Sequence, residues 1–130
     1  MRLEFNRRDE SLEAGYMAMM ETPCIVNRVN FTLNEFKKGC SEFDVWGFFE
    51  DEPAGMFFLD GNHPHIAILN KYHGKCGKVI KFATNLALKK HGELIADIHK
   101  DNDKAIRLVE RLGFEYEKTN GDISTYRLGE

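Results

Sequence analysis

The chain has few cysteines and no long apolar run. Its three cysteines, Cys24, Cys40 and Cys76, are an odd number without a Cys-x-x-Cys pair or a nearby His-x-x-x-His. This pattern argues against a disulfide framework and against structural zinc. No stretch approaches the roughly 18 apolar residues of a membrane span, and residues 1–5 lack the apolar run of a signal peptide. The sequence therefore predicts a cytoplasmic protein with no metal site and no membrane partner.

Composition and charge limit the function further. With 130 residues, 42% of them hydrophobic and 30% charged, and with no repeat or low-complexity linker, the sequence predicts a single domain over residues 1–130. The net charge of −3 argues against nucleic acid as the main partner. Residues 71–92, however, contain six lysines and no carboxylate. A local excess of cations at the start of a helix favours a bound polyanion.

Hydrophobic periodicity predicts an α+β fold. A first helix, capped by Asp9 or Ser11, is expected to end at Pro23. A capping box that begins at Thr32 predicts a second, short helix. The expected strands cover residues 2–6, 43–49, 55–59, 65–69, 94–98, 114–118 and 123–128.

Two longer helices complete the expected order, β-α-α-β-β-β-α-β-α-β-β. One follows a glycine-containing turn and stops at Gly92, and the other is capped by Asn102. The longer of these helices lies between two strands, so the segment is a right-handed βαβ unit. We therefore expect residues 65–69 and 94–98 to lie side by side and parallel within one mixed sheet.

Three motifs resemble those of the GNAT superfamily of N-acyltransferases. Residues 45–56 are similar to the central hairpin of the family, with its acidic turn. Residues 68–75 follow the Val-x-Pro-x-x-Arg-Gly-x lead into the acyl-CoA diphosphate loop, with Asn70 for the proline and His73 for the arginine or glutamine. Residues 102–114 match the Asn-x-x-Ala-x-x-x-Tyr-x-x-x-Gly-Phe helix, which is the most specific of the three motifs. The chain thus resembles an N-acyltransferase with a GNAT-like mixed sheet.

The resemblance implies a co-substrate and a reaction. Acetyl-CoA, or another acyl-CoA, would give its acyl group directly to an amine acceptor, a small molecule or a protein amino group, without a covalent enzyme intermediate. The backbone amides after the fourth strand would hold the diphosphate, with Lys71, Lys75 and Lys78 adding positive charge, and the fourth strand would offer backbone to the pantetheine and acetyl group. The residues expected to bind the cofactor are Ile68, Leu69, His73, Gly74, Lys75, Cys76, Gly77, Lys78 and Asn102.

Source and assembly are also suggested by the resemblance. Residues 65–67, just before the loop, are similar to those of compact family members encoded by bacteriophages, which would place the protein in a host cytoplasm. Many relatives pair through sheet edges, so the terminal hairpin is a candidate homodimer contact.

The sequence departs from the family pattern at two places. Counted from His73, Cys76 and Lys78 stand where the loop needs small residues, because glycine lets phosphate approach the backbone. Val109 stands where many members have the tyrosine that protonates the CoA thiolate, and valine has no proton to donate. Two functions therefore stay open: an N-acetyltransferase, and a GNAT-like binding or assembly protein without chemistry.

Several side chains allow two interpretations. His65 is the first candidate for the general base, because it is on the strand that lines the acyl site and an imidazole titrates near neutrality. His63 and Asp60 are alternatives, and a histidine on a strand also occurs as an ordinary surface or core residue. Asn102 is a helix cap, a cofactor contact or both. Cys76 is either a reactive thiol near a helix start or a small apolar packing residue.

Overall fold

The computed structural model describes residues 1–129, with every side chain among them except that of Cys24. The elements are β1 (Arg2–Glu4), α1 (Arg8–Met20), α2 (Pro23–Val26), α3 (Leu33–Gly39), β2 (Asp44–Phe49), β3 (Pro53–Asp60), β4 (His63–Ile68), the 3₁₀-helix η1 (Asn70–Tyr72), α4 (Gly77–His91), β5 (Glu93–His99), α5 (Asp103–Arg111), β6 (Glu115–Asn120) and β7 (Ile123–Gly129). The expected α+β class is confirmed, and α2 and η1 are additions to the expected order.

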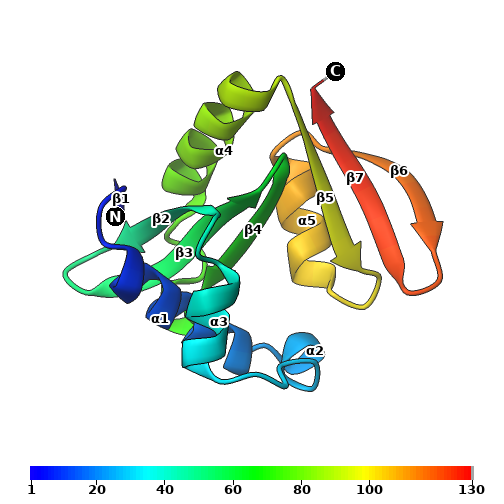
Figure 1. The fold of residues 1–130 in the computed structure, drawn as a ribbon. Helices are drawn as coiled ribbons and strands as arrows, with labels where there is room; N and C mark the ends of the chain where they lie inside the picture. The colour runs from blue at the N-terminus through cyan, green and yellow to red at the C-terminus, as the bar shows by residue number, and fades with distance from the viewer. Residues whose placement is uncertain (130) are drawn as a thin grey trace.

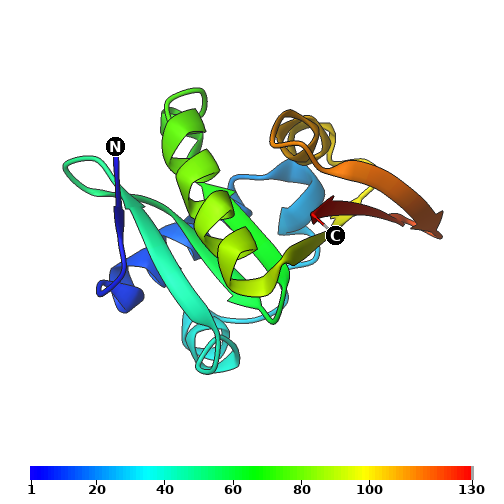
Figure 2. The same ribbon diagram turned by 90° about the horizontal axis from the view of Figure 1, so that it is seen from above.

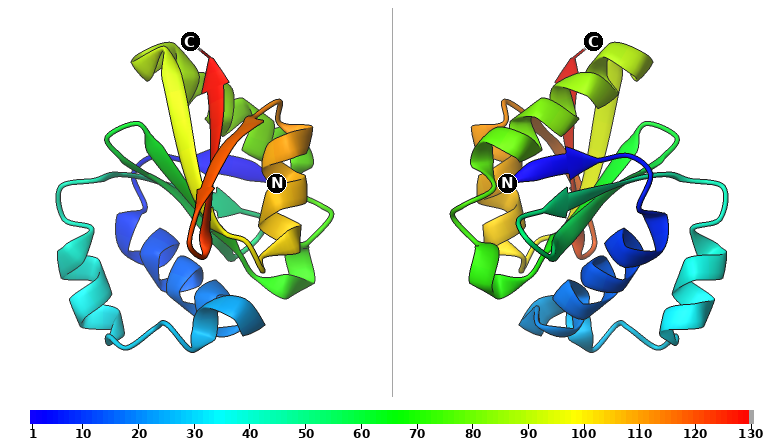
Figure 3. Two further views of the ribbon diagram at one scale, coloured as in Figure 1. Left: turned by 90° about the vertical axis from the view of Figure 1, so that its right-hand side faces the viewer. Right: turned by 90° about the vertical axis from the view of Figure 1, so that its left-hand side faces the viewer.

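The strands form two antiparallel sheets rather than one mixed sheet. The first has the order β1-β2-β3-β4 and the second the order β5-β7-β6. Helix α4 covers one face of the first sheet, and α1 and α3 cover the other (Figures 1 and 2). Figure 3 shows α1, α2 and α3 together at one end of the molecule. Strand β6 lies at the outer edge of the second sheet, so the terminal hairpin forms a sheet edge, as expected.

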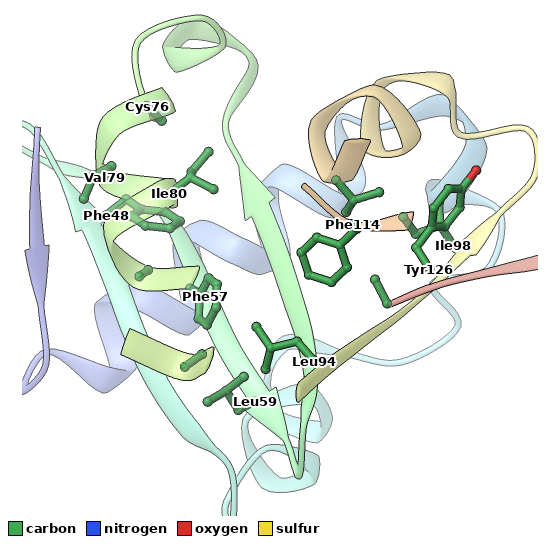
Figure 4. Close-up of a cluster of buried hydrophobic side chains, with 14 of the residues drawn as sticks. Phe48, Phe57, Leu59, Cys76, Val79, Ile80, Leu94, Ile98, Phe114 and Tyr126 are labelled. Carbon is green, nitrogen blue, oxygen red and sulfur yellow. The ribbon is translucent and has the colours of Figure 1, made fainter. Parts of the chain in front are cut away.

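Two apolar clusters follow from this layering. The larger cluster fills the wedge between the first sheet, α4 and the second sheet, where Phe48, Phe57 and Leu94 are completely buried (Figure 4). The smaller cluster joins α1 and α3 to the other face, through residues such as Leu12 and Phe36. Because strand side chains alternate between faces, the larger cluster includes Phe57 and Leu59 of β3, and the smaller cluster includes Met56 and Phe58.

The expected parallel pairing of β4 with β5 is wrong. The two strands begin close together and then diverge (Figures 1 and 4). At the start of the divergence the Ile95 N–H donates to the Asn62 carbonyl at 3.0 Å. In a parallel ladder the Ile95 carbonyl would next accept from residue 64, but this residue is Pro64, which has no N–H. The ladder therefore stops and the two strands separate, which leaves a V-shaped opening between their backbones (Figure 4).

Replacing Pro64 with alanine should extend this ladder. The backbone N–H that alanine supplies at this position can donate to the Ile95 carbonyl, and a bond worth about 1 kcal/mol slows amide hydrogen exchange roughly fivefold. We expect exchange measured by NMR to show this protection at residue 64 of the variant. An amide at residue 64 that exchanges like an open peptide would mean that the divergence has another cause.

Helix α1 begins without the expected side-chain cap. Arg7 occupies the N-cap position without a capping bond, so neither Asp9 nor Ser11 caps the helix. Ser11 is buried, and its hydroxyl donates to the Arg7 carbonyl at 2.6 Å. Pro23 starts α2, where its fixed φ suits the first helical position. The capping box at Thr32 is confirmed, with both of its hydrogen bonds present.

Candidate functional site

The segment between β4 and α4 is an exposed loop with room beside its backbone. Gly74 has a φ of 84°, a left-handed conformation that favours glycine. A Cβ atom added at Gly74 or at Gly77 would meet no atom within 4 Å. A ligand can therefore approach the main chain of this loop closely.

From Gly74 to Val79, at the end of the loop and the start of α4, most backbone N–H groups have no acceptor among the described residues. The exception is Lys75, whose N–H donates to the Tyr72 carbonyl at 3.1 Å. Such free donors at a helix start, together with the helix dipole, form an anion-binding site. Within residues 1–129 no acceptor is found for the N–H groups of Gly74, Cys76, Gly77, Lys78 and Val79.

Two lysines, one in the loop and one in the first turn of α4, are available to an anion, and a third is not. Lys75 and Lys78 are exposed, and no carboxylate of the described chain lies within ion-pair distance of either. Lys71, which was expected to add charge, is instead paired with Glu52. The same carboxylate accepts a hydrogen bond from the Tyr72 hydroxyl at 3.0 Å. Both hydrogen bonds lower the pKa of Glu52, and the one from Lys71 has the larger effect. Lys71 therefore anchors the loop to the β2–β3 turn.

Cys76 and His73 turn their side chains toward the protein. The Cys76 thiol is buried and donates to the Tyr72 carbonyl at 3.5 Å. Burial raises the pKa of Cys76, so the packing interpretation holds and the reactive thiol does not. The His73 ring has its Nε2 atom 2.8 Å from the Ile68 carbonyl oxygen. Cys76 thus has a buried side chain and a backbone N–H without an acceptor among the described residues.

Alternate residues of β4 present their backbone groups to the V-shaped opening. The Leu69 N–H donates to the Ala54 carbonyl at 2.9 Å, which places the odd-numbered residues in the ladder with β3 and turns Ile66 and Ile68 to the free edge. The Leu69 carbonyl also accepts from Tyr72 at 2.9 Å. Leu69 therefore has no free backbone group, whereas the N–H of Ile68 is free at the strand edge. Ile66 was missed, because its orientation depends on the strand pairing.

A polar pocket lies where the two sheets diverge. It has a volume of about 300 Å³ and combines two imidazoles with two carboxylates. The side chains come from the end of β3, from β4 and from β5. The residues that line it are Asp60, His63, Pro64, His65 and Asp97. The three residues considered as a general base therefore meet in one place.

His65 is the imidazole best suited to accept a proton at neutral pH. One face of its ring stacks on Phe58, with ring centroids 4.6 Å apart, while the rest of the side chain is exposed in the pocket. Desolvation on this side lowers the pKa of His65; Asp60 and Asp97 act in the opposite direction, and His63 adds to the lowering. This shift favours the neutral ring, which is the form that a base requires.

Asp97 and Thr125 belong to the same pocket region and were not singled out from the sequence. The Thr125 hydroxyl donates to Asp97 Oδ1 at 2.7 Å, and His63 Nδ1 lies 3.4 Å from Asp97 Oδ2. The available signal was a carboxylate within an otherwise apolar strand. The contact partners themselves could not be derived without the pairing of β5 with β7.

The structure shows how Asn102 and Val109, both singled out from the sequence, are placed at α5. Asn102 caps the helix, since its Oδ1 accepts the Ala105 N–H at 3.2 Å. Val109 is 7% exposed and packs in the larger apolar cluster with Phe114. This position of α5 consequently supplies packing and no proton donor.

Among the side chains that the structure describes, no group of three or more His, Cys, Asp or Glu is arranged to hold a metal ion. None of the described helices is both long enough and apolar enough to span a bilayer.

Comparison with solved structures shows that several acetyltransferases have the same fold, as the sequence motifs predicted. A Pyrococcus horikoshii protein, PH1933, superposes with a TM-score of 0.77 at 13% identity over 99% of this chain and 98% of its own. A variant of the spermidine N-acetyltransferase SpeG from Vibrio cholerae gives 0.71 at 15% identity, covering 99% and 95%. The Salmonella typhimurium protein yncA, solved with its cofactor acetyl-CoA, gives 0.71 at 17% identity, covering 99% and 93%.

Comparison of the sequence alone finds no match. No protein-family model matches the chain, and no curated protein matches it. At identities of 13–17% the structural likeness establishes the fold. The function has to be argued from the site.

Proposed function

We propose that the protein is an acetyl-CoA-dependent N-acetyltransferase that moves the acetyl group directly to an amine. The observation that carries this proposal is the group of unpaired N–H donors at the start of α4, those of Gly74, Cys76, Gly77 and Lys78. A structure of the same fold, yncA, contains acetyl-CoA. The loop donors with Lys75 and Lys78 would hold the diphosphate.

The free edge of β4 would hold the rest of the cofactor. The free edge of β4 offers the backbone groups of Ile66 and Ile68 to an extended pantetheine arm. A backbone N–H on this edge would polarise the thioester carbonyl. The His73 ring contacts the Ile68 carbonyl oxygen. It has to move away if the pantetheine arm is to donate a hydrogen bond to this oxygen.

The chemistry asks little of the side chains. Neutral His65 would accept a proton from the acceptor ammonium, which frees the nitrogen lone pair for attack on the thioester carbon. The carbon–sulfur bond then breaks and the sulfur leaves as a thiolate. Because Val109 has no proton to give, the thiolate would take its proton from solvent that enters the opening.

Calorimetric titration with acetyl-CoA tests the proposal first. We expect micromolar binding, followed by thiol release in the presence of a panel of primary amines, spermidine included, between pH 7 and 9. No detectable binding at millimolar acetyl-CoA would contradict the proposed function.

A second candidate function is a GNAT-like binding protein without chemistry. Burial of Val109 in the core, at the position of the family tyrosine, favours it. This candidate predicts that no amine releases thiol from acetyl-CoA, whether or not the cofactor binds. Thiol release with any member of the panel would eliminate it.

Replacing His65 with glutamine should slow acetyl transfer about a hundredfold at pH 7, because a general base contributes on this scale. As the pH falls through the lowered pKa of His65, the ring becomes charged and cannot accept a proton. The rate of the wild-type enzyme should therefore fall on the acid side, at a pH below 6.5. This fall in rate should disappear in the variant. His91→Gln, an exposed change at the end of α4, is the control. A variant with the full wild-type rate would remove His65 as the base.

A further inference from the structure

Asp97 connects the two sheets at the point where they diverge. Its Oδ1 atom accepts the Thr125 hydroxyl of β7 at 2.7 Å, and its Oδ2 atom lies 3.4 Å from His63 Nδ1 of β4. Thr125 directly faces Asp97 in the β5–β7 ladder, so the carboxylate is fixed by its neighbour in the sheet. Three strands thus contribute to one chain of polar contacts, Thr125–Asp97–His63.

A carboxylate beside one imidazole nitrogen determines how that ring behaves. It holds the proton of the neutral ring on Nδ1, leaves Nε2 as the acceptor, and stabilises the ring after Nε2 has taken a proton. His65 has the opposite surroundings, because its ring is stacked on Phe58, and desolvation lowers its pKa. The two imidazoles of the pocket therefore differ in their neighbours, a carboxylate beside His63 and an aromatic ring against His65.

We propose that Asp97 is a positioning residue that orients His63 to receive the proton which His65 removes from the acceptor ammonium. This inference rests on the proposed acetyl transfer. The N–H bond of the ammonium breaks and an N–H bond forms on His65. The proton then passes to Nε2 of His63, directly or through solvent in the pocket, and from there to bulk water. Both histidines return to neutral, and the steps need no further reactant.

The other charged groups nearby do not replace Asp97. Asp60, from the end of β3, lines the pocket and is exposed, and its carboxylate makes no hydrogen bond to any described residue. Arg28 lies 3.1 Å from the Nδ1 atom of His99. His99 is two residues beyond Asp97 and on the same face of β5. Asp97 is thus the carboxylate in contact with His63 and held in place by a second residue.

Nitrogen NMR of the His63 ring tests the positioning role without any acceptor. In the full-length protein at pH 8 we expect the neutral ring to have its proton on Nδ1, and we expect Asp97→Asn to shift the ring toward the Nε2–H form. A wild-type ring with its proton on Nε2, or a variant with an unchanged tautomer, would overturn the inference.

The kinetic test uses the amine with the fastest thiol release in the panel. We expect Asp97→Asn to lower kcat about tenfold to hundredfold with an unchanged KM for acetyl-CoA, Asp97→Glu to recover part of the rate, and Thr125→Val to give a smaller loss. Asp101→Asn, an exposed change in the β5–α5 loop, is the control. An Asp97→Asn enzyme with wild-type kcat would overturn the relay.

The two proposals fail in different ways. If acetyl-CoA does not bind to the wild-type protein, the proposed function fails, whatever the tautomer of His63. If acetyl-CoA binds and an amine is acetylated while Asp97→Asn keeps its rate, only the relay fails. Thermal unfolding of each variant shows whether a lost rate comes from a lost fold.

Discussion

Replacing Gly77 with glutamate should stabilise the fold and weaken acetyl-CoA binding at the same time. Gly77 is the first residue of α4, and a side chain there would meet no atom within 4 Å. The change gains helix propensity and places a negative charge at the positive end of the helix dipole, together worth about 1 kcal/mol. The same charge would face the diphosphate, so we expect the dissociation constant to rise about a hundredfold. Thermal unfolding and calorimetry measure the two effects.

Gly77→Gln separates charge from size. It has nearly the same shape and a similar helix propensity, so the stability should again rise, while binding should be weakened far less than by glutamate. Equal affinities for wild type and Gly77→Glu would show that the diphosphate does not lie at the start of α4.

Replacing Phe57 with alanine should cost about 3–5 kcal/mol of the free energy of unfolding. Phe57 has no exposed surface, and its ring stacks on Trp46 at 5.2 Å and meets the edge of Phe48 at 6.5 Å. It lies at the centre of the first sheet under α4 (Figure 4). Since domains of this size are stable by about 5–15 kcal/mol, the variant should be close to unfolding at 37 °C. Denaturant titration followed by circular dichroism measures the change.

Phe82→Ala is the matched control for this core substitution. Phe82 is on α4 but is 54% exposed, so its removal should change the stability by less than about 0.5 kcal/mol. Similar losses for the two variants would mean that α4 does not pack on the first sheet as described.

The helices and hairpins could be predicted because their signals are local. The capping box at Thr32 and the left-handed Gly92 at the end of α4 lie within or next to the helix they delimit. Gly61 and Gly121 have φ values of 61° and 60° in the two-residue turns of the β3–β4 and β6–β7 hairpins. None of these features depends on distant parts of the chain.

The divergence of the sheets could not be predicted in the same way. The sequence shows Pro64, but its effect requires knowing that Ile95 bonds to Asn62 and would next need a donor at residue 64. A strand–helix–strand pattern by itself indicates a continuous parallel ladder. The register decides the outcome, and the register is a property of the folded chain.

The candidate site was predicted only in its local part. The glycine turn and its lysines are contiguous in sequence, so the loop could be proposed from the chain alone. Lys71 was misjudged because its partner Glu52 lies 19 residues away in another turn. Asp97 and Thr125 were missed for a similar reason, since 28 residues separate them and only strand pairing brings them together.

Backbone NMR during titration with coenzyme A tests the central claim most directly. We predict that the amide signals of Gly74, Cys76, Gly77 and Lys78 move strongly and exchange more slowly with solvent, because their free N–H groups bind the diphosphate. The Lys75 amide, already bonded to the Tyr72 carbonyl, should keep its exchange rate. Unchanged signals for these four amides at millimolar coenzyme A would contradict the account.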